Sequence, residues 1–260
     1  MARMPDGPPP EPAVQRLRLR YAKRGRLRFA SHRDFQRSFE RALRRADVPM
    51  AYSAGFSPHP RISYANAAPT GAASEAEYLE IAVTRRCEPA QVRAALDEAL
   101  PLGLDVVEVV EAHTPGFADR LEASVWRVEL PGVSLDDAAD ALAAFLAATE
   151  VPVERLTKTG IRRFDARSAV VRAEVRPEIV DDVPDPGPQV QGGPCAILQM
   201  VVRHTTPAVR PDDVLTGLRS HAHLAPPSSP RMTRLAQGPL DEEGGAVADP
   251  LTADRDADGA

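Results

Sequence analysis

Residues 16–63 read RLRLRYAKRGRLRFASHRDFQRSFERALRRADVPMAYSAGFSPHPRIS, and this stretch decides the fold that we predict. Its first six residues alternate between two kinds of side chain, apolar Leu17, Leu19 and Tyr21 and basic Arg16, Arg18 and Arg20. A period of two is typical of a β-strand with one buried face. After a turn or bulge at residues 23–25, the alternation resumes with Leu27 and Phe29 opposite Arg26 and Arg28.

A helix is predicted to begin at Ser31, because Ser31-x-x-Asp34 fits a capping box. On a helical wheel the apolar side chains share one face: Phe35, Phe39, Ala42, Leu43 and Ala46. The arginines share the opposite face: Arg33, Arg37, Arg41, Arg44 and Arg45. We expect the apolar face to pack on the strand and the arginines to reach solvent. Pro49 ends the helix.

The patterns outside this stretch predict two sets of strands and helices. In the first set, strands at residues 62–64, 78–83 and 104–110 and a helix at residues 89–100 complete the order β-α-β-β-α-β. This is the split pattern of a ferredoxin-like sandwich. The second set has strands at residues 123–130, 151–158, 169–175, 196–202 and 232–236, helices at 134–147 and 211–218, and a basic turn at 158–163.

The predicted fold class is therefore α+β, with two tandem ferredoxin-like units. The predicted boundaries are a disordered lead at residues 1–13, a first unit at 14–115, a second unit at 120–237 and an acidic disordered tail at 238–260. The tail contains seven acidic residues and one arginine, which favours disorder.

The composition of the 260 residues excludes several classes of protein. Hydrophobic residues make up 43% and charged residues 27%, as in a folded domain. No apolar run reaches the ~18 residues of a membrane helix, and the first twelve residues lack the apolar core of a signal peptide. Cys87 and Cys195 lie far apart, with no partner at metal-ligand spacing. We predict a cytoplasmic protein with no membrane attachment, no metal and no cofactor.

Charge is unevenly distributed along the chain. Residues 13–61 contain 13 Lys/Arg and 3 Asp/Glu, whereas residues 62–260 contain 18 and 32. A local excess of this size can steer an anionic ligand, and guanidinium groups pair with phosphates through two hydrogen bonds. We predict one continuous face for RNA or another polyanion, formed by Arg16, Arg18, Arg20, Arg26, Arg28, Arg33, Arg37, Arg41, Arg44 and Arg61. The alternatives are a solvated surface or pairing with the acidic remainder of the chain.

His32 and His59 are the candidates for chemistry. Either could act as general base or acid in RNA cleavage, or could be a structural or RNA-stacking histidine. His32, Asp34 and His59 lack a further metal ligand at suitable spacing. His59 stands in the stiff loop Tyr52–Ser63, between two prolines. The aromatic residues of this region, Tyr52, Phe56 and Tyr64, either stack on unpaired bases or anchor the loop in the core.

Three motifs together resemble one family. They are Lys23-x-Gly25-x-x-Arg28-Phe29-x-Ser31-His32-x-Asp34, Arg41-Ala-x-Arg44-Arg45-Ala46 and Tyr52-Ser53-x-Gly55-Phe56-x-Pro58-His59-Pro60-x-Ile62-Ser63. Over residues 14–235 the chain is similar to the radical SAM-linked family, also called DUF2344. In that family the domain often follows a B12-binding radical SAM enzyme, and we expect this chain to be the stand-alone form. The chain has no CxxxCxxC motif for the iron–sulfur cluster, so the resemblance implies a B12-binding radical SAM partner in trans, acting on RNA. It supplies no catalytic residues.

The predicted architecture also resembles that of Cas6-type endoribonucleases of the RAMP class, which use a general-base histidine and a Gly-rich loop near the C-terminus. The chain has no such loop. Three hypotheses follow: a non-catalytic RNA-binding partner of a radical SAM enzyme, a metal-independent endoribonuclease that uses His32 or His59, and a protein-only adaptor with a basic docking face. We predict the first.

Overall fold

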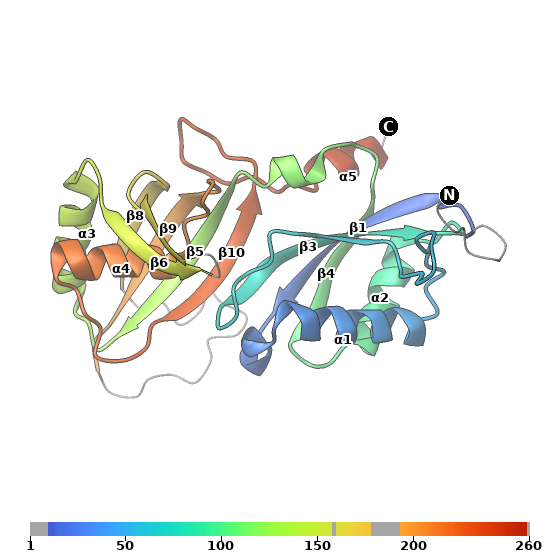
Figure 1. The fold of residues 1–260 in the computed structure, drawn as a ribbon, viewed down its shortest axis with the longest axis horizontal. Coiled ribbons are helices and arrows are strands. Elements are labelled where there is room, and N and C mark those ends of the chain that lie inside the picture. The colour runs from blue at the N-terminus through green and yellow to red at the C-terminus, as the bar shows by residue number, and fades with distance from the viewer. Residues whose placement is uncertain (1–9, 158–159, 178–192, 259–260) are drawn as a thin grey trace. The chain divides into compact units, whose positions relative to one another are not determined.

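The computed structural model describes residues 10–157, 160–177 and 193–258 (Figure 1). It is a mixed α+β structure with antiparallel strand pairs. The described residues form two compact units, one that runs to Ala118 and includes the chain from Leu251 onward, and one that runs from Asp119 to Pro250. None of their helices is both long and apolar enough to cross a membrane. The disordered lead predicted for residues 1–13 lies mostly outside the described residues.

The first unit contains strands and helices in the order that the sequence predicts: β1 (Gln15–Lys23), α1 (His32–Arg45), β2 (Ile62–Ala65), β3 (Ala73–Val83), α2 (Pro89–Ala99) and β4 (Leu104–Glu111). Its strands pair in the order β4-β1-β3-β2, and each pair is antiparallel. Strand β1 is therefore an interior strand. The short helix α5 (Thr252–Asp258) belongs to the same unit.

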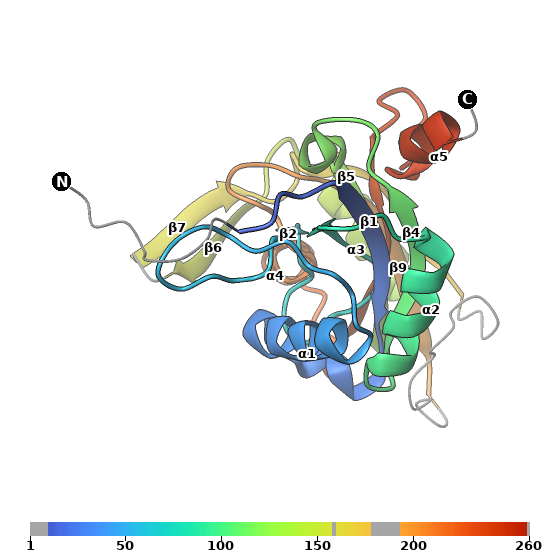
Figure 2. The same ribbon diagram turned by 90° about the vertical axis from the view of Figure 1, so that its right-hand side faces the viewer.

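Helices α1 and α2 cover one face of this sheet, and the core lies between the two layers (Figures 1 and 2). The inward side chains of β1 are Leu17, Leu19 and Tyr21, which are at most 4% exposed. Phe35 and Phe39 of α1 pack against them, and the rings of Tyr21 and Phe35 stack with centroids 4.5 Å apart. Buried aromatic surface of this kind dominates the energetics of a core, so the alternation in β1 and the apolar face of α1 together determine this layer.

The caps of α1 and α3 (Leu135–Ala147) confirm two predicted helix starts. The Ser31 hydroxyl accepts a hydrogen bond from the Asp34 N–H at 3.2 Å and donates one to the Asp34 carboxylate at 2.7 Å. Ser134 and Asp137 repeat this arrangement at 3.1 and 2.7 Å. In each case the serine satisfies a backbone donor that the first helical turn leaves free.

Residues 25–29 are not strand, contrary to the alternation that we expected to resume there. They form a short 3-10 helix, η1 (Gly25–Phe29), because Gly25 turns the chain at a φ of 53°. Leu27 packs against the core, whereas Phe29 is 67% exposed. Arg26 and Arg28 therefore lie on a turn and do not extend the basic side of β1.

The second unit has the same order with one insertion. After the short 3-10 helix η2 (Phe117–Arg120), its elements are β5 (Ala123–Pro131), α3, β6 (Pro152–Thr157), β7 (Gly160–Asp165), β8 (Val170–Arg176), β9 (Cys195–Arg203), α4 (Pro211–Ala222) and β10 (Arg231–Gly238). Four strands pair in the order β10-β5-β9-β8. Strands β6 and β7 form a separate antiparallel hairpin. Without this hairpin, the two units share one chain order and one strand order.

Two further predictions are wrong. Residues 160–165 form strand β7, where we expected a basic turn. The strand could not be recognised in the sequence, because a two-stranded ribbon buries too little surface to require alternating apolar residues. Lys158, at the start of that turn, lies outside the described residues. The tail predicted to be disordered from residue 238 contains a Leu240–Val247 bridge and helix α5. Its composition is acidic, but Leu251 and Asp254 are both 0% exposed.

Candidate nucleic-acid interface

Four arginines form one exposed row along α1. We call this row the arginine stripe, and it consists of Arg33, Arg37, Arg41 and Arg44. Steps of four, four and three residues keep the side chains on one side of the helix over about 16 Å. No salt bridge joins the stripe to a carboxylate within the described residues. The pKa of Asp34 is lowered, first by its hydrogen bond with Ser31 and further by the charge of Arg37.

The stripe faces solvent because the opposite side of α1 is buried. Phe35, Phe39 and Leu43 on that side are at most 4% exposed. Arg45, which the helical wheel places with the stripe, has a different role. Its Nη1 donates a hydrogen bond to the Ala99 carbonyl at 3.0 Å, at the last turn of α2. Arg45 therefore joins the two helices, because the carbonyls of a last helical turn lack intrahelical partners.

The arginines of β1 do not join the stripe, so the continuous face that we predicted is wrong. Since Leu17 and its neighbours face the helices, Arg16 and Arg18 point to the other face of the sheet. Arg18 is 3% exposed, with Nη1 2.5 Å from the Asp254 carboxylate and Nε 3.1 Å from Glu80. Arg16 also pairs with Glu80, at 2.9 Å. The chain's own carboxylates therefore neutralise this part of the predicted interface.

The remaining predicted arginines lie on separate elements. Arg20 and Arg28 are half-buried, and each donates to a backbone carbonyl, at 2.9 and 3.1 Å. Arg26 is exposed on η1. Arg61 is exposed just before β2, where its N–H bonds the Ala51 carbonyl at 2.8 Å. Arg26 and Arg61 are therefore available to solvent, but on loops and not on the helix.

His32, the first residue of α1, is held by its neighbours. Its ring meets the Tyr64 ring edge-on at 4.9 Å, and its Nε2 lies 3.2 Å from the side-chain nitrogen of Gln36. Since the amide nitrogen of Gln36 can only donate, Nε2 accepts. Tyr64 also contacts Phe35 edge-on at 6.0 Å, and burial, reinforced by Glu40, raises the pKa of its hydroxyl. Tyr64 thus anchors this region and does not offer a ring to RNA.

The loop Tyr52–Ser63 is a small hairpin. Tyr52 and Pro60 form a bridge, the Ser53 N–H donates to the His59 carbonyl at 2.9 Å, and the Ser53 hydroxyl accepts from the His59 N–H at 3.1 Å. Phe56 at the tip is 67% exposed and Tyr52 is 41% exposed. Both rings reach solvent, and so does Phe29, which the alternation predicted on the apolar side of a strand. Each could stack on a base.

Neither histidine is bonded to a carboxylate within the described residues. His59 is exposed, and its Nδ1 lies 2.9 Å from the Ser57 carbonyl, to which it donates. The His32 ring contacts Gln36 and Tyr64. A histidine that acts as general base is commonly oriented by a carboxylate, which also stabilises its protonated form. Within the described residues, no group of three or more His, Cys, Asp or Glu could hold a metal ion.

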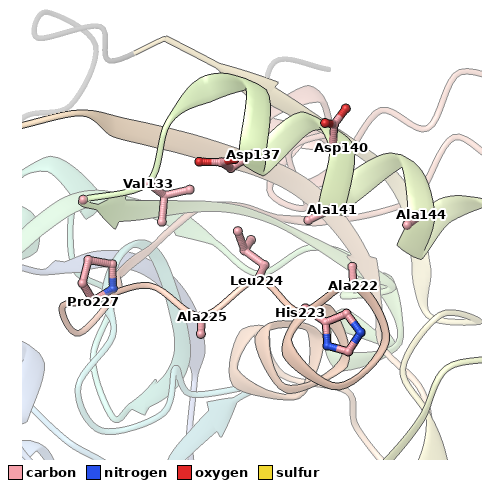
Figure 3. A pocket seen from close by; sticks show the side chains of 11 residues that line it. Val133, Asp137, Asp140, Ala141, Ala144, Ala222, His223, Leu224, Ala225 and Pro227 are labelled. Atoms are coloured by element: carbon pink, nitrogen blue, oxygen red, sulfur yellow. The ribbon is translucent and has the colours of Figure 1, made fainter.

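A cavity of about 420 Å³ lies in the second unit, between α3 and the segment after α4 (Figure 3). Asp137, Asp140 and His223 line it together with alanines, Leu224 and other small groups. No arginine or lysine is among the described residues of its lining. Two carboxylates disfavour an anionic ligand there, so the stripe on α1 is the better candidate for binding a polyanion.

Comparison with known proteins identifies one family. A family model described as an uncharacterised protein conserved in bacteria (DUF2344) matches residues 16–211. The match includes the arginine stripe, the Tyr52–Ser63 hairpin, nearly all of β1 and all of β5. No curated protein matches the chain.

Proposed function

Since the chain belongs to the DUF2344 family, whose description gives no activity, we propose from the site itself that it binds RNA without catalysis, through the arginine stripe. The observation that supports this proposal is a contrast within one unit. Arg16 and Arg18 each have a carboxylate within 3.1 Å, whereas the four arginines of the stripe have none among the described residues.

The physics of the stripe favours a polyanionic ligand. Like charges at i,i+4 destabilise a helix by about 0.2–0.5 kcal/mol per pair, and Arg33, Arg37 and Arg41 form two such pairs. Phosphate groups relieve this repulsion and accept two hydrogen bonds from each guanidinium. The exposed rings of Phe29 and Phe56 could add base stacking, which makes unpaired RNA a better ligand than a duplex.

The same proposal covers the architecture, the lack of catalysis, the partner enzyme and the cellular compartment. The shared strand order of the two units supports a tandem ferredoxin-like architecture, similar to that of Cas6-type enzymes. The contacts of His32 and His59 favour binding over cleavage. The family resemblance supports a B12-binding radical SAM enzyme as the partner that acts on the bound RNA. The low cysteine content, Cys87 and Cys195 alone, is compatible with the cytoplasm.

Charge reversal of the stripe tests the proposal. We expect the double variant Arg37→Glu plus Arg41→Glu to bind a single-stranded RNA oligonucleotide at least ~10-fold more weakly, because two phosphate contacts become repulsive. The plot of log K against log salt should also flatten by about 0.7 for each lost contact. Fluorescence anisotropy over a series of salt concentrations measures both quantities.

The matched control is Arg162→Glu plus Arg219→Glu, which changes the net charge equally at two exposed positions of the second unit. We expect it to change RNA affinity much less. Equal losses in the two double variants would mean that net charge alone governs binding, and an unchanged affinity in the stripe variant would refute the proposed interface. A protein that co-purifies with the chain despite ribonuclease, and only with an intact stripe, would point to the adaptor.

A further inference from the structure

The cavity of the second unit has two walls. One wall is α3, and the other is the segment 222–227 at and after the end of α4 (Figure 3). The volume of about 420 Å³ lies within the ~300–1,000 Å³ that is typical of small-molecule sites. Such sites are mostly apolar and contain a few polar groups that orient the ligand. The cavity is therefore large enough for a small organic ligand, and its lining indicates which kind.

Backbone hydrogen bonds fix the wall formed by residues 222–227. His223 has a left-handed backbone conformation, with a φ of 55°, and its N–H donates to the Leu218 carbonyl. The Leu224 N–H donates to the same carbonyl at 3.2 Å. A left-handed residue with such hydrogen bonds is a common end of a helix, and the Leu224 side chain beyond it is only 9% exposed. This wall is therefore formed by the chain itself, before any ligand binds.

The two walls meet at Gly132, in the turn that leads into α3. Gly132 has a φ of 82°, and a Cβ at this position would overlap Cγ of Pro227. Glycine is thus required both by the backbone conformation and by the close approach of the second wall. This contact fixes the spacing of the walls at one end of the cavity.

The wall on α3 contains two carboxylates. Asp137 and Asp140 both line the cavity, and their spacing of three residues makes them neighbours on the helix. Asp137 belongs to the helix cap, where it accepts a hydrogen bond from the Ser134 hydroxyl at 2.7 Å. Asp140 lies beyond the first turn, where the helix dipole no longer favours an acidic residue. It makes no hydrogen bond or salt bridge within the described residues, so the structure of α3 does not account for it.

The rest of the lining is mostly small and apolar. Ala141 and Ala144 each follow one of the two aspartates by four residues, so they continue the same side of α3. Ala222 and Leu224 line the cavity from the other wall. Carboxylates beside an aliphatic surface suit a ligand with a cation at one end and a hydrocarbon chain at the other. A primary ammonium group has three N–H donors for carboxylate oxygens.

We propose that this cavity binds a small aliphatic amine, with its ammonium group on Asp137 and Asp140 and its hydrocarbon chain on the alanines. Other classes of ligand fit less well. The two carboxylates repel an anion, and the described residues include no group of three or more His, Cys, Asp or Glu that could hold a metal ion. The alanines offer no partners for the hydroxyls of a sugar. The proposal does not depend on RNA binding, because the stripe belongs to the first unit.

Two probes that differ in one group test the proposal on the full chain. They are n-pentylamine and n-pentanol, which have the same hydrocarbon chain, but only the amine is charged at neutral pH. We expect the amine to bind at least ~10-fold more tightly, because hydrogen bonds between charged groups contribute that much affinity. Titration followed by ¹H–¹⁵N NMR measures both affinities, and the shifts should be confined to amides around the two walls.

Two matched pairs of variants locate the site. Asp140→Asn and Asp136→Asn each remove one charge from an exposed position of α3, but only Asp140 lines the cavity. We expect Asp140→Asn to weaken the amine at least ~10-fold and Asp136→Asn to leave it unchanged. Ala144→Leu should block the amine by filling the cavity, whereas Ala143→Leu, on the exposed side chain next to it, should not. Substitutions at exposed positions usually change stability little, so all four variants should fold.

Four results would overturn the proposal. They are amide shifts that do not saturate with the amine, equal affinities for the amine and the alcohol, equal losses in Asp140→Asn and Asp136→Asn, and equal binding of the amine to Ala144→Leu and Ala143→Leu. The first would mean that there is no site, and the second that the carboxylates do not select the ligand. The third and fourth would place the bound amine outside this cavity.

Discussion

Strand β1 and helix α1 are neighbours in the sequence and both are rich in arginine. The arginines of the strand pair with carboxylates of the chain, whereas those of the stripe on the helix do not within the described residues. Arg18 on β1 is 3% exposed and lies between the carboxylates of Asp254 and Glu80. Arg41 on α1 is exposed, and the described residues place no carboxylate in a salt bridge with it. Arginine on an interior strand is a structural residue, and arginine on the outer side of a covering helix is free for a ligand.

The difference shows that local charge density does not define an interface. The excess of positive charge over residues 13–61 suggested one continuous basic face. The arginines of β1, however, lie on the face of the sheet that is opposite to α1, so the two sets of arginines are separated by the sheet. Glu80 lies 62 residues from Arg18 in the chain, and Asp254 lies 236 residues from it. Only long-range packing decides which arginines obtain a carboxylate.

The largest expected effect is the loss of Arg18. Arg18→Ala leaves the fully buried carboxylate of Asp254 without its cation, while Glu80 keeps its pair with Arg16. Breaking a buried ion pair in this way costs about 3–5 kcal/mol. We expect the free energy of unfolding in urea to fall by that amount. Arg41→Ala is the matched control, since exposed substitutions usually change stability by no more than ~0.5 kcal/mol. Similar losses in the two variants would remove the distinction between the two sets.

The second effect is a dependence of stability on pH that comes from Asp254, the buried partner of Arg18. The pKa of Asp254 is lower in the folded chain than in an unfolded one, where an aspartate titrates near 3.9. Its contribution to stability is therefore complete above that value and is lost as the pH falls through the lower, folded pKa. Urea unfolding between about pH 5 and pH 2 measures the loss.

The control for this prediction is Asp254→Asn. The free energy of unfolding of this variant should fall less over the same pH range than that of the natural chain. Asp34 and Asp165 also have lowered pKa values, so the natural chain alone would not isolate one group. Arg41→Gln should keep the pH dependence of the natural chain, because no salt bridge of the stripe titrates. An Asp254→Asn variant with an unaltered pH dependence would contradict the role given to the Arg18–Asp254 ion pair.

The sequence predicted local structure well where a single element shows its own pattern. The alternation around Leu17 and the serine caps at Ser31 and Ser134 led to the observed strand and helices. It failed where structure depends on distant partners. The acidic composition near Asp254 suggested disorder, because no local feature reveals that Arg18 and Thr114 provide its hydrogen bonds. For the same reason the stripe could be predicted from the helical wheel, but its separation from β1's arginines could not.

The third effect concerns how α1 presents the stripe. Ser31→Ala removes the hydroxyl that accepts the Asp34 N–H, and the loss of a helix N-cap costs about 0.5–2 kcal/mol. We expect a drop of about 1 kcal/mol in the free energy of unfolding, with faster amide exchange in the first turn of α1. Ser31→Asp should restore most of the loss, because aspartate caps equally well. If the first turn exchanges no faster in Ser31→Ala, the cap does not hold the start of the stripe.

The smallest expected effect has the opposite sign. Arg41→Gln removes like-charge neighbours at i,i+4, and each such pair destabilises a helix by about 0.2–0.5 kcal/mol at low salt. The variant should therefore be slightly more stable than the natural chain at low ionic strength and equal to it near 1 M salt, where the Debye length falls to ~3 Å. Urea unfolding at the two salt concentrations measures the difference. A loss of stability at low salt would mean that Arg41 has a partner within the folded chain, and the contrast between a neutralised β1 and an unpaired α1 would no longer hold.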